Sequence, residues 1–205
     1  MSLLEVRNDA RKSILETWTK TDRAFRGTIS EKSIKPRDQM IPLRIYTPSE
    51  LMRFPVMVFY HGGGWMQCDL DTHDQMCRLF ATFIPCIVVS VDYRLAPEAK
   101  YPLGLQDCYD SLCWAASEAS NLGGDPHKLF VSGDSAGGNL AAAVSIMARD
   151  NKGPNIKSQL LLYPVTDVSS FDRKSYRDYA DGYMLLEKDM KWYRDLYISK
   201  QNQVF

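Results

Sequence analysis

A glycine-flanked serine, placed between a short apolar run and a helix-forming stretch, constrains the fold of this chain more than any other feature. Residues 129–132 (LFVS) have the pattern of a strand, and the sequence Gly133-Asp-Ser-Ala-Gly137 follows them directly. Residues 139–149 are rich in strong helix formers. A serine at a sharp strand-to-helix turn adopts a strained backbone, which requires small residues two positions away on either side. The pattern predicts a nucleophile elbow with Ser135 as the candidate nucleophile, and the alternative is a structural tight turn.

A second glycine cluster, HGGGW at residues 61–65, follows the apolar run Pro55–Tyr60. Parallel strands end at one edge of a sheet, so the N–H groups of this loop should emerge beside Ser135. Acyl transfer builds negative charge on the former carbonyl oxygen, and accessible N–H donors stabilise that charge. We therefore predict an oxyanion hole whose donors are Gly63, Gly64 and Ala136, supported by His61 and Gly62. The alternatives are an ordinary glycine-rich turn and a phosphate-binding loop, although Trp65-Met66 does not supply the Lys-Ser/Thr pair of such a loop.

Apolar and polar runs alternate along the rest of the chain. The runs Pro55–Tyr60 and Cys86–Tyr93 have the pattern of strands buried on both faces, and residues 158–163 predict another strand. Helical patterns over residues 71–83 and 104–118 separate the strands. Residues 27–48 predict two antiparallel strands at a sheet edge. This order favours an α/β fold with a mostly parallel sheet covered by helices on both faces.

The two ends of the chain differ in character from this middle part. Residues 3–18 mix apolar and charged positions at roughly helical spacing, which predicts one or two amphipathic helices. Residues 169–205 are charged and rich in aromatic side chains, with a helical pattern over 186–197. The stripe formed by Met190, Tyr193 and Tyr197, with Trp192 beside it, is interpreted as a packing face, and the alternative is a cofactor-binding face.

Composition narrows the class of protein further. The 205 residues, 45% of them apolar, suit one domain spanning 1–205 with a sheet core over 27–168. The 25 basic and 25 acidic residues cancel, which argues against nucleic acid or an anionic membrane as a partner. The five cysteines are scattered and odd in number, so we expect free thiols and a cytoplasmic location. We find no signal peptide and no apolar run long enough to span a bilayer.

Together, the motifs resemble those of the hormone-sensitive-lipase-like branch of the α/β-hydrolases. HGGGW at 61–65 and GDSAGGN at 133–139 match its oxyanion and nucleophile signatures, and DYRLAPE at 92–98 with Tyr101-Pro102 matches its intervening motif. The resemblance runs from about residue 40 to residue 197. It implies an α/β-hydrolase fold in which a serine attacks short or medium acyl esters, as in carboxylesterases and lipases, with no cofactor.

The resemblance also implies roles for segments outside the two glycine motifs. Helices over residues 1–26 and about 175–197 would cap the pocket. The loop 92–98 would brace the site, with Arg94 and Glu98 forming a buried ion pair. His61 would orient the glycine loop rather than act as a base.

The chain departs from the family at the general base. In this fold the nucleophile is followed by Asp or Glu and then by His, but no histidine follows Ser135. Of the three histidines, His61 belongs to the glycine loop, His73 to a predicted helix, and His127 to the far end of the nucleophile strand. Asp167 would lie on the correct edge, without a histidine to orient.

Family members continue with two further strands that carry the acid and the histidine, so we expect a chain without these last strands. Residues 198–205 would then mark a truncation or an alternative end, and residues 160–162 would form an apolar sheet edge that invites aggregation.

A metal site is an alternative interpretation of this region, because His61, Cys68, His73 and Cys77 lie within seventeen residues of one another. Structural zinc sites usually bring their ligands in tight pairs, which this spacing lacks, so we predict no metal.

The expected function is hydrolysis of small carboxylic esters through Ser135, impaired because the acid and the histidine are missing. One alternative is a non-catalytic small-molecule-binding module on the same fold, as in the gibberellin receptors. The other is a truncated product without function. The sequence does not indicate an oligomeric state.

Overall fold

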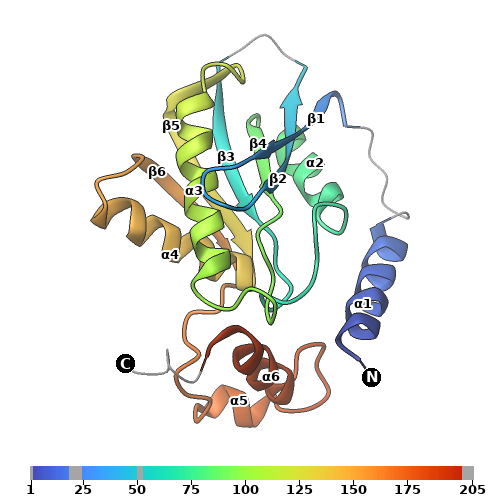
Figure 1. Cartoon of the computed structure of the whole chain (residues 1–205). Coiled ribbons are helices and arrows are strands. Elements are labelled where there is room, and N and C mark those ends of the chain that lie inside the picture. The colour runs from blue at the N-terminus through green and yellow to red at the C-terminus, as the bar shows by residue number, and fades with distance from the viewer. Residues whose placement is uncertain (1, 19–24, 50–52, 200–205) are drawn as a thin grey trace.

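A computed structural model describes residues 2–18, 25–49 and 53–199, and it has an α/β architecture (Figure 1). The elements in chain order are α1 (Leu3–Trp18), β1 (Gly27–Ile34), β2 (Ile41–Pro48), β3 (Phe54–Tyr60), α2 (Asp74–Phe83), β4 (Ile87–Val91), α3 (Leu103–Glu118), β5 (Gly124–Asp134), α4 (Ala136–Asp150), β6 (Ile156–Leu162), α5 (Lys174–Asp178) and α6 (Glu187–Tyr197). The predicted order of strands and helices is confirmed, with boundaries that differ by a few residues at most elements.

The strands form one mixed sheet in the order β1-β2-β4-β3-β5-β6. The pairs β4–β3, β3–β5 and β5–β6 are parallel, while the hairpin β1–β2 lies antiparallel at the edge, as predicted. Since the four central and later strands run in one direction, their carboxyl ends meet at a single edge of the sheet. That edge carries both glycine motifs.

The central strands are buried on both faces because helices cover both. In β3, Val56, Val58 and Tyr60 belong to the larger core cluster, which includes residues of α3 and α4. Met57 and Phe59 point the other way, into a smaller cluster that includes residues of α2. This alternation follows the two-residue period of a strand and explains why the run is apolar without interruption.

The helix α2 begins at Asp74, three residues later than the predicted start. Residues 69–72 form a tight turn instead, in which Asp69 Oδ1 accepts hydrogen bonds from the N–H groups of Asp71 and Thr72, at 3.0 and 2.9 Å. Short Asp and Thr side chains compete with a helix for backbone partners in this way. As a result, His73 precedes the helix and does not lie within it.

The predicted buried pair of Arg94 with Glu98 is wrong. Arg94 binds Asp107 of α3, with Nε–Oδ2 and Nη2–Oδ1 distances of 2.8 and 2.7 Å. Glu98 points outward, with its side chain 63% exposed, and pairs with Arg7 of α1. Asp107 is only 2% exposed, and a buried carboxylate is costly without a charged partner. Arg94 therefore pairs with Asp107, whereas the exposed Glu98 can be solvated by water.

Three helices lie apart from the sheet layers, with α5 and α6 beyond the carboxyl edge of the sheet and α1 to one side (Figure 1). The predicted packing role of the α6 aromatic stripe is confirmed: Met190 and Tyr197 are buried, and the Tyr197 ring stacks on Trp65 at 4.7 Å. By contrast, α1 has no fully buried residue. The predicted N-terminal cap segment 1–26 falls partly outside the described residues. No helix within the described part of the chain is long and apolar enough to cross a membrane.

Candidate active site

Ser135 occupies the turn between β5 and α4 with backbone angles of φ 52° and ψ −118°. This region is unfavourable for a residue with a side chain, and such strain persists only where the surroundings fix it. Here the Ser135 N–H donates to the Leu162 carbonyl at 2.9 Å, and its own carbonyl accepts the N–H groups of Asn139 and Val165. The geometry is that of the predicted nucleophile elbow.

The flanking glycines are dictated by contact with neighbouring backbone. An added Cβ at Gly137 would lie 2.0 Å from the Tyr60 carbonyl oxygen and 2.6 Å from that of His61. An added Cβ at Gly133 would lie 2.4 Å from the Gly137 carbonyl carbon. No side chain fits at either position, because real Cβ contacts are longer. The elbow therefore presses directly on the end of β3, where the glycine loop begins.

The glycine loop leaves backbone donors free beside the serine. Gly63 and Gly64 adopt positive φ of 107° and 59°, which glycine tolerates best. Within the described residues, the N–H groups of Gly63, Gly64 and Ala136 donate no hydrogen bond. Gly63 and Gly64 line one cavity together with Ser135, and Ala136, which follows Ser135, is buried at the first turn of α4. Free donors converging on one space are what binding of an oxyanion requires.

His61 is fully buried beneath this loop. Its ring stacks on Tyr93 at 4.4 Å, its Nδ1 lies 2.8 Å from the Gly62 carbonyl oxygen, and the Tyr93 hydroxyl donates to the His61 carbonyl at 2.7 Å. Burial, together with the neighbouring His73, lowers the pKa of His61 to about 4. The side chain is therefore neutral near pH 7, and its contacts are those of a group that shapes the loop.

Asp134 and His73 form a pair that the sequence analysis did not identify. His73 Nε2 lies 3.2 Å from Asp134 Oδ1, which also accepts the Gly62 N–H at 2.9 Å. Burial alone would raise the pKa of Asp134, but the hydrogen bond and charge of His73 and the Gly62 N–H hold it below its ordinary value. The only signal in the sequence was an acidic residue at the end of a strand buried on both faces.

The remaining residues considered in the sequence lie elsewhere. His127 is exposed near the start of β5, at the opposite end of that strand from Ser135, as predicted. Asp167 lines the cavity, but its two oxygens bind Ser169 and Arg173, which lower its pKa. Cys77 packs in the smaller core cluster. In the part of the chain that the structure describes, no three His, Cys, Asp or Glu side chains gather to hold a metal, and the five cysteines are free.

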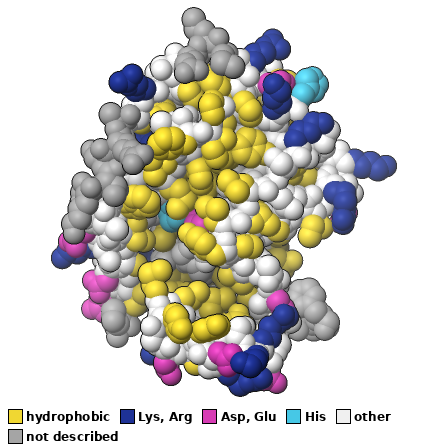
Figure 2. All heavy atoms as spheres, turned by 180° about the vertical axis from the view of Figure 1, so that it is seen from behind, with side chains coloured by type: hydrophobic (Ala, Val, Ile, Leu, Met, Phe, Trp, Pro, Cys, Tyr) yellow, Lys and Arg dark blue, Asp and Glu magenta, His cyan; other side chains and the backbone are white. Residues whose placement is uncertain are grey.

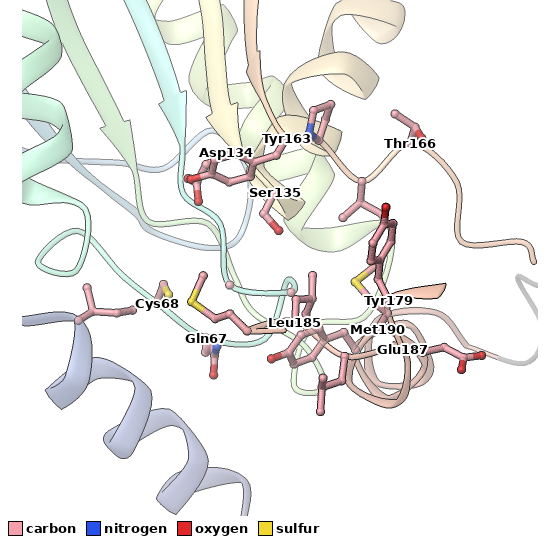
Figure 3. A pocket seen from close by; sticks show the side chains of 18 of the residues that line it. Gln67, Cys68, Asp134, Ser135, Tyr163, Thr166, Tyr179, Leu185, Glu187 and Met190 are labelled. Carbon is pink, nitrogen blue, oxygen red and sulfur yellow. The ribbon is translucent and has the colours of Figure 1, made fainter. Parts of the chain in front are cut away.

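A cavity of about 1040 Å³ opens above Ser135. The Ser135 side chain projects into it from the sheet edge, and Leu185 and Met190 lie on the opposite wall (Figure 3). Ile14 and Trp18 of α1 also line it. Seen from behind, this face is hollowed, and hydrophobic side chains surround the hollow (Figure 2). A mostly apolar cavity with a few convergent polar groups is typical of a small-molecule site.

Comparison with known proteins gives a consistent result. The profile of the alpha/beta hydrolase fold family matches residues 57–204. Carboxylesterase NlhH of Mycobacterium tuberculosis is 45% identical over 159 residues, which cover 75% of this chain and 49% of that protein. An arylesterase of Saccharolobus solfataricus is 39% identical, over 78% of this chain and 51% of its own length. The chain thus spans about half the length of these curated relatives.

Solved structures of esterases superimpose closely on the chain. An esterase of Pyrobaculum calidifontis has a TM-score of 0.93 at 37% identity, covering 100% of this chain and 67% of the other. The thermophilic carboxylesterase EstE1, cloned from a metagenomic library, has a TM-score of 0.91 at 35% identity, covering 97% and 68%.

Proposed function

Because this chain belongs to the α/β-hydrolase fold family, in its hormone-sensitive-lipase-like branch, we propose that it is a serine hydrolase of carboxylic esters. One observation supports this most strongly: Ser135, at its strained turn, shares a cavity with the free N–H groups of Gly63 and Gly64. A nucleophile and preorganised donors on one space are the two parts that acyl transfer needs.

The proposed reaction begins when Ser135 Oγ attacks the ester carbonyl carbon and forms a C–O bond. The former carbonyl oxygen becomes an oxyanion, which the N–H groups of Gly63, Gly64 and Ala136 stabilise. The alcohol then leaves with a proton, and water hydrolyses the acyl-serine. Losing one such donor typically slows the reaction by about 10²–10³-fold.

The serine hydroxyl must also lose a proton, and this step needs a base. Among the described residues, no histidine nitrogen is hydrogen-bonded to Ser135 Oγ. We therefore propose that these residues by themselves turn over esters slowly, with the residual catalysis of a nucleophile that has no hydrogen-bonded base, about 10³–10⁴-fold over water.

We also propose that α1 and the segment α5–α6 cap the cavity and contact the acyl or alcohol part of the ester. Ile14 and Trp18 from α1, and Leu185, Met190 and Tyr193 from the other segment, line it.

A cytoplasmic location, inferred from the cysteines, stays a prediction.

A second candidate function is non-catalytic binding of a small molecule. Two observations favour it: the cavity is large and mostly apolar, and among the described residues no histidine is hydrogen-bonded to Ser135 Oγ. Such a module would use the glycine loop and the cap residues to hold a ligand without cleaving it.

Chemical rescue distinguishes the two functions. Hydrolysis of p-nitrophenyl butyrate is measured with and without added imidazole, which can replace a missing base, in the wild type and in Ser135→Ala. Ser145→Ala is the matched control, because this α4 serine does not line the cavity and its hydroxyl donates to the Ala141 carbonyl of the same helix. We expect slow hydrolysis that imidazole accelerates only when Ser135 is present, and labelling of Ser135 by a fluorophosphonate.

Three outcomes are informative. Equal rates in the wild type and in Ser135→Ala, with no labelling, would overturn the hydrolase proposal. Fast, Ser135-dependent turnover without imidazole would overturn the proposed impairment. Tight binding of benzyl propyl ketone, in which a methylene group replaces the ester oxygen of phenyl butyrate and prevents cleavage, would favour the binding module if labelling is absent.

A further inference from the structure

His73 and Asp134 form a buried pair that the proposed reaction does not use directly. Their exposed fractions are 7% and 8%, and His73 Nε2 lies 3.2 Å from Asp134 Oδ1. An ionised carboxylate only accepts hydrogen bonds, so the ring nitrogen is the donor. A hydrogen bond to a buried charged group is stronger than a neutral one, which makes this pair a firm link between the loop before α2 and the nucleophile turn.

Asp134 passes this link on to the glycine loop. Its Oδ1, the atom that contacts His73, also accepts the Gly62 N–H at 2.9 Å. The carboxylate presses against Gly62 so closely that an added Cβ there would lie 2.2 Å from Oδ2. Gly62 immediately precedes Gly63 and Gly64. The position of the Asp134 carboxylate therefore determines the backbone direction at Gly62, and with it the orientation of the Gly63 and Gly64 N–H groups.

The His73 ring is itself held from several sides. Its Nδ1 lies 3.0 Å from Thr72 Oγ1, and its ring centroid lies 6.0 Å from that of Phe59 and 5.5 Å from that of His61. Thr72 in turn is anchored in the tight turn by hydrogen bonds to both backbone groups of Asp69. These contacts fix the position of the His73 ring. The Asp134 carboxylate is hydrogen-bonded to that ring, so its position is fixed as well.

Removing His73 would leave the Asp134 carboxylate buried with the Gly62 N–H as its remaining donor among the described residues. A buried carboxylate in that state draws in water or moves toward other donors, because an unpaired charge is costly. With the His73 N–H no longer directed at it, the negative charge beside Ser135 would also oppose the oxyanion more strongly.

We infer that His73 is a positioning residue for the glycine loop: by fixing Asp134 against Gly62, it keeps the N–H groups of Gly63 and Gly64 directed at the ester oxygen. The inference rests on the proposed function for its chemical consequence, while its structural part stands on the contacts alone. His73 does not touch the reacting atoms and acts only through Asp134.

The test combines a local and a chemical measurement on His73→Ala and His73→Gln, with His127→Ala as the matched control. Hydrogen exchange of the segment 61–66 reports on the loop whether or not the protein is active. Labelling by a fluorophosphonate, analysed as a maximal rate and a half-saturation concentration, reports on Ser135 and its donors separately from substrate binding.

In His73→Ala we expect faster exchange in 61–66 and a maximal labelling rate lower by about ten- to a hundredfold, with the half-saturation concentration unchanged. His73→Gln retains an N–H donor and should recover most of both properties. His127→Ala should match the wild type. If His73→Ala does not fold, the comparison of His73→Gln with Asp134→Asn, which keeps Oδ1 but loses the charge, replaces it. We then expect near-wild-type exchange and labelling in His73→Gln and a clear loss of both in Asp134→Asn.

Unchanged exchange in 61–66 would overturn the inference, and so would a loss that appears only in the half-saturation concentration. If the wild type is not labelled at all, the proposed function fails, and hydrogen exchange alone then decides whether His73 positions the loop.

Discussion

The carboxyl edge of the sheet and the helix α1 are held in place by different forces. At the edge, the Gly137 backbone packs directly on the carbonyl oxygens at the end of β3. A buried ion pair between Asp107 and Arg94 adds to this packing. The helix α1 has no fully buried residue and is attached through arginines. Arg7 donates to the carbonyl oxygens of Met66 and Ala96 at 2.6 and 2.7 Å and pairs with Glu98, and Arg11 pairs with Asp69 and Asp71.

The difference indicates how the fold divides its tasks. Close packing resists any added atom, so the sheet edge keeps Ser135 and its donors in a fixed geometry. Partly exposed ion pairs contribute little and are weakened by salt, so α1 can move without unfolding the core. The following predictions test whether this division is real, from the largest expected effect to the smallest.

The largest contrast is expected between two glycines. In Gly137→Ala the new methyl group would meet the Tyr60 carbonyl, and a rigid strand end cannot yield, so we expect a loss of at least about 4 kcal/mol in the free energy of unfolding. Gly182, between α5 and α6, has φ 81° and no atom within 4 Å of an added Cβ. Gly182→Ala should cost only about 1 kcal/mol.

Urea unfolding followed by tryptophan fluorescence measures both glycine variants. If Gly137→Ala does not accumulate as a folded protein and Gly182→Ala does, the loss at Gly137 is even larger than predicted and the prediction is supported. Losses within about 1 kcal/mol of each other would show that the edge is less rigid than its contacts imply.

A pH dependence should separate the edge from α1. Burial, with the charges of Asp69 and Asp71, raises the pKa of Asp92 to about 6. A carboxyl group whose pKa is raised in the folded state gives stability below its unfolded pKa and loses it as pH rises through the folded value. Asp92→Asn should therefore gain stability relative to the wild type between pH 4 and 6, by about 3 kcal/mol. Asp9→Asn, an exposed position on α1, should show no such gain.

His61 acts in the opposite direction. Its pKa of about 4 is lower than in an unfolded chain, so its contribution is present above pH 6.5 and lost as pH falls toward 4. In the wild type, the effects of Asp92 and His61 on the free energy of unfolding change in opposite directions with pH and largely cancel. In Asp92→Asn only the effect of His61 remains, so this variant should lose stability as pH falls toward 4. Thermal unfolding at intervals between pH 4 and 7 measures this, and parallel curves for the wild type and Asp92→Asn would contradict the assignment.

Ion pairs provide the next contrast. Asp107 accepts hydrogen bonds from the Arg94 backbone and guanidinium, and it is 2% exposed. Asp107→Asn removes the charge but not the volume, so we expect a loss of about 2–3 kcal/mol in the free energy of unfolding. Asp71→Asn breaks the partly exposed contacts to Arg11 and Arg44 and should cost less than about 1 kcal/mol. Denaturation midpoints that fall equally in both variants would remove the distinction between buried and exposed pairs.

The sequence predicts local backbone structure well, but it does not predict contacts between side chains that are far apart in the chain. The strands, the sharp turn at Ser135 and the glycine turn after β3 are local patterns, in which a few adjacent residues determine the backbone, and their predicted backbone agrees with the structure. The partners of Arg94 and of Glu98 were not predictable in this way. Both sit in one loop, and their contacts depend on its path past α3 and α1, which adjacent residues do not encode.

His73 illustrates the limit most clearly. Its helical surroundings in the sequence suggested a place within a helix, but the Asp69–Thr72 turn delays the helix and turns the ring toward Asp134. The pair joins residues far apart in the sequence, and its chemistry becomes visible only when the strand order brings β3 beside β5. Functional residues that act through another residue carry little sequence signal of their own.

The smallest effect, and the one that tests α1 most directly, is expected from Arg11→Gln. The side chain is 37% exposed and pairs with Asp69 and Asp71, so the global free energy of unfolding should change by less than about 1 kcal/mol. Hydrogen exchange in residues 3–18 should nevertheless rise, since without a buried face the helix depends on its ion pairs. Raising the salt concentration from about 0.05 to 0.5 M should loosen α1 in the wild type in the same way, because screening shortens the reach of exposed charges. The variant, which has already lost the pair, should respond less to salt, and exchange at the Ser135 turn should stay unchanged in both. Equal salt sensitivity in the two proteins would mean that contacts other than these charges hold α1 over the cavity.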